Sequence, residues 1–143
     1  MRPFEPGDQA AARSLILDGM REHWGDDFDA SFNLDIDDIA ASFAAGVFLV
    51  AAAGGQIVGT GAMTPGDGGI AIVTRMATSA AYRRKGVARM LLAALVEQAR
   101  GRGCARIVLG TNIRWEDAIQ FYTAFGFKEM RRSAEGVVFS MEL

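Results

Sequence analysis

The chain has 143 residues, with 15 lysines and arginines against 17 aspartates and glutamates, and half of its residues are apolar. These values are typical of one folded domain over residues 1–143, and they exclude a disordered or collagen-like chain. The formal net charge of −2 argues against general nucleic-acid binding, so any anion site must be local. The single cysteine, Cys104, excludes an intramolecular disulfide and a zinc-binding thiol cluster, which favours a reducing compartment and no metal.

The N-terminal part of the chain predicts a short strand followed by two helices. Residues 2–4 favour an edge strand, and Pro6-Gly7-Asp8 opens a helix that fades near Trp24-Gly25. Apolar side chains then recur at helical spacing over residues 35–45, which predicts a second, weaker helix that Gly46 ends. The first twenty residues carry charges instead of the apolar region of a secretory signal, so we expect a cytoplasmic protein.

An uncharged stretch over residues 39–66 is long enough to cross a bilayer as one helix. Its glycines divide it into short pieces, however, and these favour strands over 47–53 and 56–64 joined by Gly54-Gly55. We therefore predict a hairpin here and no membrane association. A further turn leads into a central strand over residues 70–78.

The C-terminal half alternates helices with strands. Solvent-facing and inward-facing side chains separate cleanly over residues 86–102, which predicts a long amphipathic helix. A short strand over 106–110 and a helix over 115–125 follow, and two late strands are expected over 127–131 and 137–143. The order is that of a mixed α/β domain of the α+β class. The late strands could leave an edge through which a homodimer forms.

The segment Tyr82-Arg83-Arg84-Lys85-Gly86-Val87-Ala88-Arg89, between a strand and a helix, holds four of the fifteen basic residues. The first N–H groups of a helix lack internal partners and the helix dipole is positive there, so backbone amides can bind a diphosphate. Small residues at Gly86 and Ala88 would let phosphates approach the backbone. The alternative to a phosphate site is a basic, solvent-exposed start of a helix, in which the glycine only separates two secondary-structure elements.

This segment resembles the acetyl-CoA signature of the GNAT superfamily of N-acetyltransferases, Gln/Arg-x-x-Gly-x-Gly/Ala, at Arg83, Gly86 and Ala88. The resemblance covers nearly the whole chain, because residues 75–77 are similar to the family's fourth strand and residues 118–127 to its late helix and following strand. It implies a single GNAT-like domain with a central, mostly antiparallel mixed sheet. In that fold the fourth and fifth strands splay apart and helices flank the sheet.

The resemblance also implies where acetyl-CoA would bind. The pantetheine arm would lie between the splayed strands, held by the fourth strand's backbone, and amides from Arg84 to Ala88 would hold the pyrophosphate. Asn112, just past the fifth strand, is either a polar contact to pantetheine or a helix cap. The expected cofactor-binding residues are Met76, Ala77, Thr78, Arg83, Arg84, Lys85, Gly86, Val87, Ala88, Arg89 and Asn112.

Tyr122 matches the tyrosine that family members often place near the CoA sulfur as general acid. When an amine attacks the acetyl carbonyl, a thiolate leaves, and a phenol within reach can stabilise or protonate it. A core aromatic with a satisfied hydroxyl is the alternative. No general base is evident, because Thr74 and Arg75 stand where relatives commonly place a carboxylate near the fourth strand.

Candidates for the acceptor site are Glu22, His23 and Trp24, at the end of the first helical region, and Trp115. Glu22 or His23 could serve as the base, although a surface or capping role for His23 and a packing role for the tryptophans are equally compatible. The aspartates between Asp26 and Asp38 could attract a cationic amine or form a solvated loop.

These observations predict an acetyl-CoA-dependent N-acetyltransferase that acts on a primary amine of a small molecule or peptide by direct attack. Cys104 follows a glycine before a strand and is interpreted as a small buried residue, so no acyl-cysteine intermediate is expected. A non-catalytic acyl-CoA-binding or regulatory module is the alternative function. The acceptor itself is not encoded in any motif.

Overall fold

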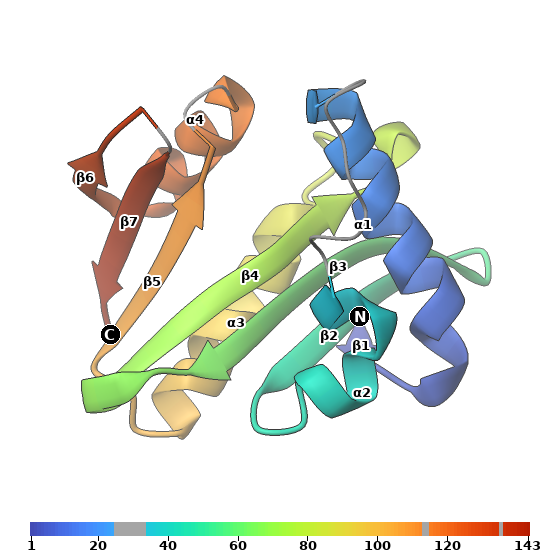
Figure 1. Cartoon of the computed structure of the whole chain (residues 1–143), viewed down its shortest axis with the longest axis horizontal. Coiled ribbons are helices and arrows are strands. Elements are labelled where there is room, and N and C mark those ends of the chain that lie inside the picture. The colour runs from blue at the N-terminus through green and yellow to red at the C-terminus, as the bar shows by residue number, and fades with distance from the viewer. Residues whose placement is uncertain (25–33, 113–114, 135) are drawn as a thin grey trace.

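The computed structural model of the chain describes residues 1–24, 34–112, 115–134 and 136–143, with the side chains of His23 and Trp24 left out. One seven-stranded sheet runs through it in the order β1-β2-β3-β4-β5-β7-β6 (Figure 1). Its neighbouring strands pair antiparallel, except β4 and β5, which are parallel. The strands are β1 (Arg2–Pro3), β2 (Val47–Ala53), β3 (Gln56–Pro65), β4 (Ile70–Thr78), β5 (Arg106–Thr111), β6 (Lys128–Arg132) and β7 (Val137–Glu142).

Helices cover both faces of this sheet. One buried cluster lies between the sheet and the N-terminal helices, and another lies between the sheet and the two later helices. This arrangement confirms the predicted mixed α/β domain. The helices are α1 (Gln9–Trp24), α2 (Ile39–Ser42), α3 (Val87–Gly101) and α4 (Glu116–Phe125), with 3₁₀ turns at Pro6–Asp8, Leu34–Asp37, Asp67–Gly69 and Ala80–Tyr82.

The prediction of one continuous helix over residues 35–45 is wrong, because the structure has two short helical segments there. A 3₁₀ turn ends at Asp37, and α2 then covers only four residues. Asp38 separates them because its carboxylate accepts a hydrogen bond from the backbone N–H of Ala41 at 3.2 Å, which makes it the N-cap of a new helix. The apolar spacing still predicted the buried face, since Ile36 and Ile39 are fully buried.

The predicted hairpin is confirmed. β2 and β3 pair antiparallel, and Gly54 and Gly55 join them with φ values of +57° and +79°. Two successive residues with positive φ give the turn whose twist matches the flanking strands, and glycine reaches this conformation with little strain. Among the described residues, no helix is both long and apolar enough to cross a membrane.

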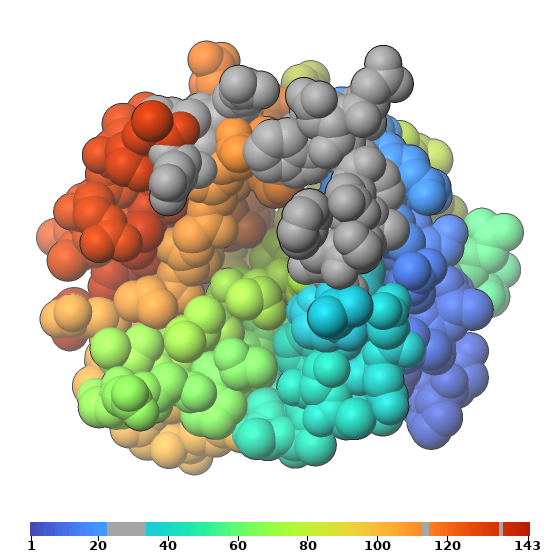
Figure 2. Space-filling model, viewed as in Figure 1, coloured from blue at the N-terminus to red at the C-terminus, as the bar shows by residue number. Residues whose placement is uncertain are grey.

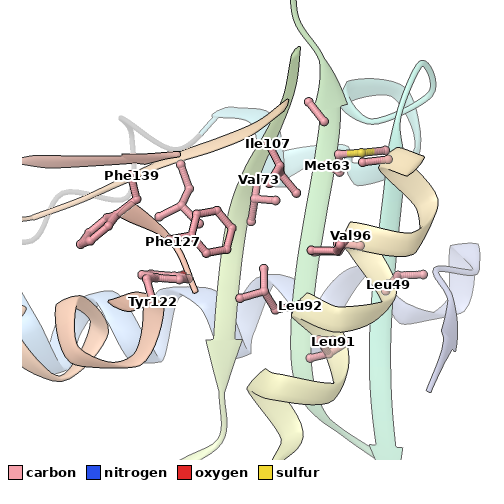
Figure 3. Close-up of a cluster of buried hydrophobic side chains, with 14 of the residues drawn as sticks. Leu49, Met63, Val73, Leu91, Leu92, Val96, Ile107, Tyr122, Phe127 and Phe139 are labelled. Carbon is pink, nitrogen blue, oxygen red and sulfur yellow. The ribbon is translucent and has the colours of Figure 1, made fainter. Parts of the chain in front are cut away.

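The core between the sheet and the later helices fixes the position of α4. Figure 3 shows Tyr122, Phe127 and Phe139 grouped near Val73, while side chains of α3 such as Leu92 project toward the same strand. Because all five of these residues are buried, Tyr122 ties α4 to the same packed layer as β4, β7 and α3. The sheet and this layer form the rigid base of the site described below.

The far edge of the sheet is β6, which is exposed along its whole length. Its charged side chains are of the kind that discourages strand-to-strand pairing between molecules. The homodimer expected through the late strands therefore stays a prediction, and β7, which pairs with β6 on one side and β5 on the other, has no free edge. The charged residues of β6 are Lys128, Glu129, Arg131 and Arg132.

Candidate functional site

The parallel strands β4 and β5 separate in the middle of the sheet. They pair over three residues only, from Ile70 opposite Arg106 to Ile72 opposite Val108. Beyond this point β4 stays with β3, whereas β5 turns away with β7, and Figure 1 shows the two arrows diverging. Along residues 73–78, β4 has no strand partner on its β5 side among the described residues. In an antiparallel pair, alternate residues direct their N–H and C=O away from the partner, so this edge can bind an extended ligand.

A β-bulge lies within this open edge of β4. Thr60 pairs with Ala77 and Ala62 with Thr74, so Arg75 and its neighbour together oppose a single residue of β3. Arg75 has a φ of +57°, and its carbonyl accepts a hydrogen bond from Thr60 Oγ1 at 2.8 Å. Positive φ at a non-glycine residue costs free energy and is concentrated at functional sites, as are bulges.

The bulge directs the Arg75 side chain toward the N-terminal elements. Its guanidinium forms a two-pronged ion pair with Asp35, with Nε 2.8 Å from one carboxylate oxygen, and Nη1 lies 3.8 Å from the sulfur of Met20. The Arg75 side chain is 18% exposed. A carboxylate therefore does lie beside β4, but it is supplied from 40 positions away and is paired with arginine.

The loop between β4 and α3 presents a row of free backbone N–H groups. The N–H of Arg83 donates to the Ala80 carbonyl at 3.5 Å, and the first bond of α3 runs from the N–H of Met90 to the Gly86 carbonyl at 3.0 Å. Between them, the N–H groups of residues 84–89 have no acceptor among the described residues. Backbone N–H groups without acceptors at a helix start are the feature that the predicted anion cradle requires, and the cradle itself stays a prediction.

Two left-handed residues shape this loop. Arg84 has a φ of +61° and Gly86, the N-cap of α3, a φ of +83°, and between them Lys85 has a negative φ. Alternation of this kind turns successive amides to one side and creates a concave anion site. A Cβ at Gly86 would meet no atom within 4 Å, so the backbone conformation, and not a contact within the chain, requires glycine there.

The basic side chains of the loop have several partners. The Arg83 guanidinium forms an ion pair with the Glu22 carboxylate, at the end of α1. The Arg89 guanidinium lies 5.5 Å from the centre of the Phe125 ring, which joins the start of α3 to the end of α4. Lys85 Nζ lies 5.4 Å from the centre of the Tyr82 ring. These contacts keep positive charge beside the free amides.

Tyr122 lies in the aromatic core beneath this end of the sheet. Its side chain is 8% exposed, and its ring centre lies 5.1 Å from that of Phe121 and 5.9 Å from that of Phe139. Burial raises the pKa of the Tyr122 hydroxyl well above its ordinary value. No hydrogen bond joins this hydroxyl to another described residue. The ring therefore packs as a core aromatic does, while the hydroxyl keeps its capacity to donate.

A model of the GNAT acetyltransferase family matches residues 11–127. The chain belongs to the GNAT family. Among curated proteins it is similar to the uncharacterized N-acetyltransferase YsnE of Bacillus subtilis, with 36% identity over 77 residues, which cover 52% of this chain and 51% of that protein. N-acetyltransferase 8 of Rattus norvegicus is 30% identical over 118 residues, covering 77% of this chain and 53% of that protein. The chain thus spans about half the length of these curated relatives.

Solved structures confirm the GNAT fold. A GNAT-family acetyltransferase from Staphylococcus aureus Mu50 superposes with a TM-score of 0.90 at 19% identity, covering 98% of this chain and 96% of that one. PaiA N-acetyltransferase from Thermoplasma acidophilum was crystallised in complex with coenzyme A. It superposes with a TM-score of 0.84 at 14% identity, covering 99% of this chain and 97% of that one.

In this GNAT domain, most of the predicted site residues lie at one end of the sheet. β4 and β5 both end there, since Thr78 is the last residue of β4 and Asn112 follows the last residue of β5. The loop that leads into α3 follows β4 at the same end. In the space-filling view the surface is hollowed beside the orange of β5, next to the green of β4 (Figure 2). Ligands commonly bind at the carboxyl ends of parallel strands.

Asn112 and Trp115 both precede α4, but only one of them caps the helix. Trp115, not Asn112, is the N-cap residue of α4, and its backbone N–H donates to the Asn112 carbonyl at 3.1 Å. Both side chains are half-buried. Asn112 thus lies three residues before the helix cap, where a polar contact to a ligand between the strands is compatible with its position.

The acidic N-terminal stretch is partly structural in this GNAT chain. Asp38 is the N-cap of α2, Asp37 pairs with Arg13 at 3.0 Å, and Asp35 pairs with Arg75. Asp26, Asp27 and Asp29, like the side chains of His23 and Trp24, lie outside the described residues. The described aspartates are therefore less suited to attract a cationic amine, because their carboxylates already have partners.

Cys104 is half-buried in the connection between α3 and β5, not fully buried as predicted. It follows the C-terminal end of α3, and the free amides lie at the other end. The helix has 15 residues, so its ends are about 22 Å apart. The expectation that no acyl-cysteine intermediate forms stays a prediction.

The buried phenol of Tyr122 predicts a loss of stability in alkali. The unfolded chain has a tyrosine pKa of about 10 and the folded chain a higher one, so the stabilisation is complete below about pH 10 and is lost as the pH rises further. The melting temperature of the unmodified protein should therefore fall more steeply between about pH 9.5 and 11 than that of Tyr122→Phe. Tyr82→Phe, at a half-buried tyrosine, is the control, and equal slopes for all three proteins would contradict the prediction.

Proposed function

We propose that this GNAT-family chain is an N-acetyltransferase that moves an acetyl group from acetyl-CoA to a primary amine of a small molecule or peptide. The observation that carries the proposal is the row of free N–H groups over residues 84–89, beside the open edge of β4. A structural neighbour, PaiA N-acetyltransferase, was crystallised with coenzyme A, which supports the same class of ligand here.

The residues of the site fit coenzyme A. Amides of residues 84–89 would hold the pyrophosphate, with Arg83 and Arg89 adding positive charge, and the backbone of residues 76–78 would hold the pantetheine. Asn112 would add a polar contact from the β5 side. Bound acetyl-CoA supplies an activated thioester. The reaction then forms a bond between the amine nitrogen and the acetyl carbon, breaks the carbon–sulfur bond and transfers one amine proton to solvent or to a base.

Tyr122 would donate a hydrogen bond to the leaving sulfur. Thiols have an ordinary pKa of about 8.5, which is below that of the buried phenol. The phenol therefore stays protonated at neutral pH, and stabilisation of the thiolate by a hydrogen bond is favoured over complete proton transfer. This refines the role of a general acid that its position in the family suggests.

The acceptor would approach from the side of α1. Glu22, His23 and Trp24 form the last turn of this helix, and we propose that they, with Trp115 from the α4 side, contact the acceptor. The carboxylate of Glu22 is suited to a cationic amine, although in the described structure it is paired with Arg83. The amine must lose a proton before it attacks.

The test combines binding with turnover. Calorimetry with coenzyme A measures the anion site directly, and thiol release from acetyl-CoA is followed with free amino acids, polyamines, aminoglycosides and peptide N-termini. We expect coenzyme A to bind and at least one class of amine to accelerate thiol release. Failure to bind coenzyme A would overturn the proposal, whereas binding without thiol release from any amine would favour the non-catalytic acyl-CoA-binding module.

A further inference from the structure

The ion pair between Glu22 and Arg83 joins the last turn of α1 to the anion loop, across 61 positions of sequence. Both side chains are 45% exposed. Arg83 directly precedes the row of free N–H groups, so the Glu22 carboxylate is an internal anion placed beside a site built for phosphates. The same guanidinium cannot give its full set of hydrogen bonds to a carboxylate and to a phosphate at once.

The neighbouring ion pair of Arg75 and Asp35 differs in its surroundings. The Arg75 side chain is 18% exposed and is held in two-pronged contact, with Met20 beside it. Because Arg75 lies within β4 and its side chain is largely buried, we interpret its ion pair with Asp35 as structural. Arg83 lies instead in a loop and is half exposed, so its guanidinium can exchange partners with little loss of packing.

We propose that Glu22 competes internally with coenzyme A for Arg83, so that the phosphates of the incoming ligand displace the Glu22 carboxylate. This inference rests on the proposed function. A pyrophosphate on the loop amides brings more negative charge to Arg83 than one carboxylate does, so the guanidinium should exchange the carboxylate for the phosphates. Once displaced, Glu22 is a free carboxylate at the acceptor side, so coenzyme A and a cationic amine should each increase the affinity for the other.

The experiment is a double-mutant cycle with coenzyme A itself as the probe. Calorimetry at low salt is carried out on the unmodified protein, Glu22→Gln, Arg83→Gln and the double variant. We expect Glu22→Gln to tighten binding by about 2- to 5-fold, the range for an exposed ion pair. Arg83→Gln should weaken binding by about 10-fold, the lower end of the range for a hydrogen bond to a charged group. The double variant should match Arg83→Gln, because Glu22 then has no arginine for which to compete.

A matched control removes the same charge elsewhere on α1. Asp18 lies one turn earlier, and its carboxylate is 3.6 Å from Arg21 of the same helix, not from the loop. Asp18→Asn should leave the affinity for coenzyme A unchanged. Melting temperatures of all variants check that the fold is retained.

Each other outcome overturns the inference. If Glu22→Gln also increases the affinity for coenzyme A in the Arg83→Gln background, the cause is simple charge repulsion between Glu22 and the ligand. If Glu22→Gln alone weakens binding, Glu22 orients Arg83 for the ligand. An unchanged affinity would mean that the pair is irrelevant to the site. If the unmodified protein does not bind coenzyme A, the proposed function fails and not only this inference.

Discussion

Replacement of Gly86 by valine should weaken the binding of coenzyme A by about 100-fold. Gly86 has a φ of +83°, which a β-branched residue adopts only with strain, so the loop should relax toward negative φ. The amides of residues 84–89 would then no longer point to one side. Loss of one or two hydrogen bonds to a charged group accounts for an effect of this size. Calorimetry with coenzyme A measures it directly.

Gly103 provides the matched control for this substitution. Its φ is +77° and a Cβ there would meet no atom within 4 Å, so the strain and the free space are the same as at Gly86. It lies just beyond the opposite end of α3 from the loop. Gly103→Val should lower the melting temperature about as much as Gly86→Val does, while leaving the affinity for coenzyme A unchanged. Equal losses of affinity in both variants would show that Gly86 acts only through stability.

Replacement of Tyr122 by phenylalanine should lower the turnover number for thiol release by about 100-fold, the lower end of the range for a proton or hydrogen-bond donor in the transition state. The ring remains, so packing against Phe121 and Phe139 is retained. Because no described residue is hydrogen-bonded to the hydroxyl, its removal leaves no buried partner unpaired. The KM for acetyl-CoA and the melting temperature at pH 7 should therefore be unchanged.

The other tyrosine of the chain is the control for this loss of a hydroxyl. Tyr82 lies in the 3₁₀ turn before the loop, with Lys85 over its ring, and Tyr82→Phe retains that ring. We expect full turnover from it. A Tyr122→Phe enzyme that works at the unmodified rate would assign Tyr122 to the core alone, and thiolate stabilisation would then have to come from backbone amides.

The raised pKa also constrains the alkaline side of the activity profile. Because the phenol must be protonated to donate, and its pKa lies above the ordinary value of about 10, turnover should not fall between pH 8 and 10 through ionisation of Tyr122. A loss of activity within that range that is absent from Tyr122→Phe would contradict this assignment.

Much of the fold was predictable because its signals are local. Alternation and glycine turns predicted the β2–β3 hairpin and the central strand β4, and the separation of Leu91 and Leu95 from Arg89 and Glu97 predicted α3. The loop over residues 83–89 was predicted as an anion site for the same reason, since basic residues and a glycine before a helix form a compact motif. The break in the second predicted helix at Asp38 was missed, because apolar spacing marks the buried face and not the continuity of the helix.

The amino-acid sequence by itself determined most of the elements, their buried faces and the place of the basic, glycine-containing loop before α3, because each depends on residues within a few positions of one another. The tertiary structure alone decided that β4 carries a bulge at Arg75, that Asp35 lies beside this bulge and that Glu22 lies against Arg83. These pairs join residues 40 and 61 positions apart. Contacts at such separations leave no periodic pattern in the sequence, since they arise only when the packed sheet brings α1 and the 3₁₀ turn at Leu34–Asp37 against the carboxyl end of β4.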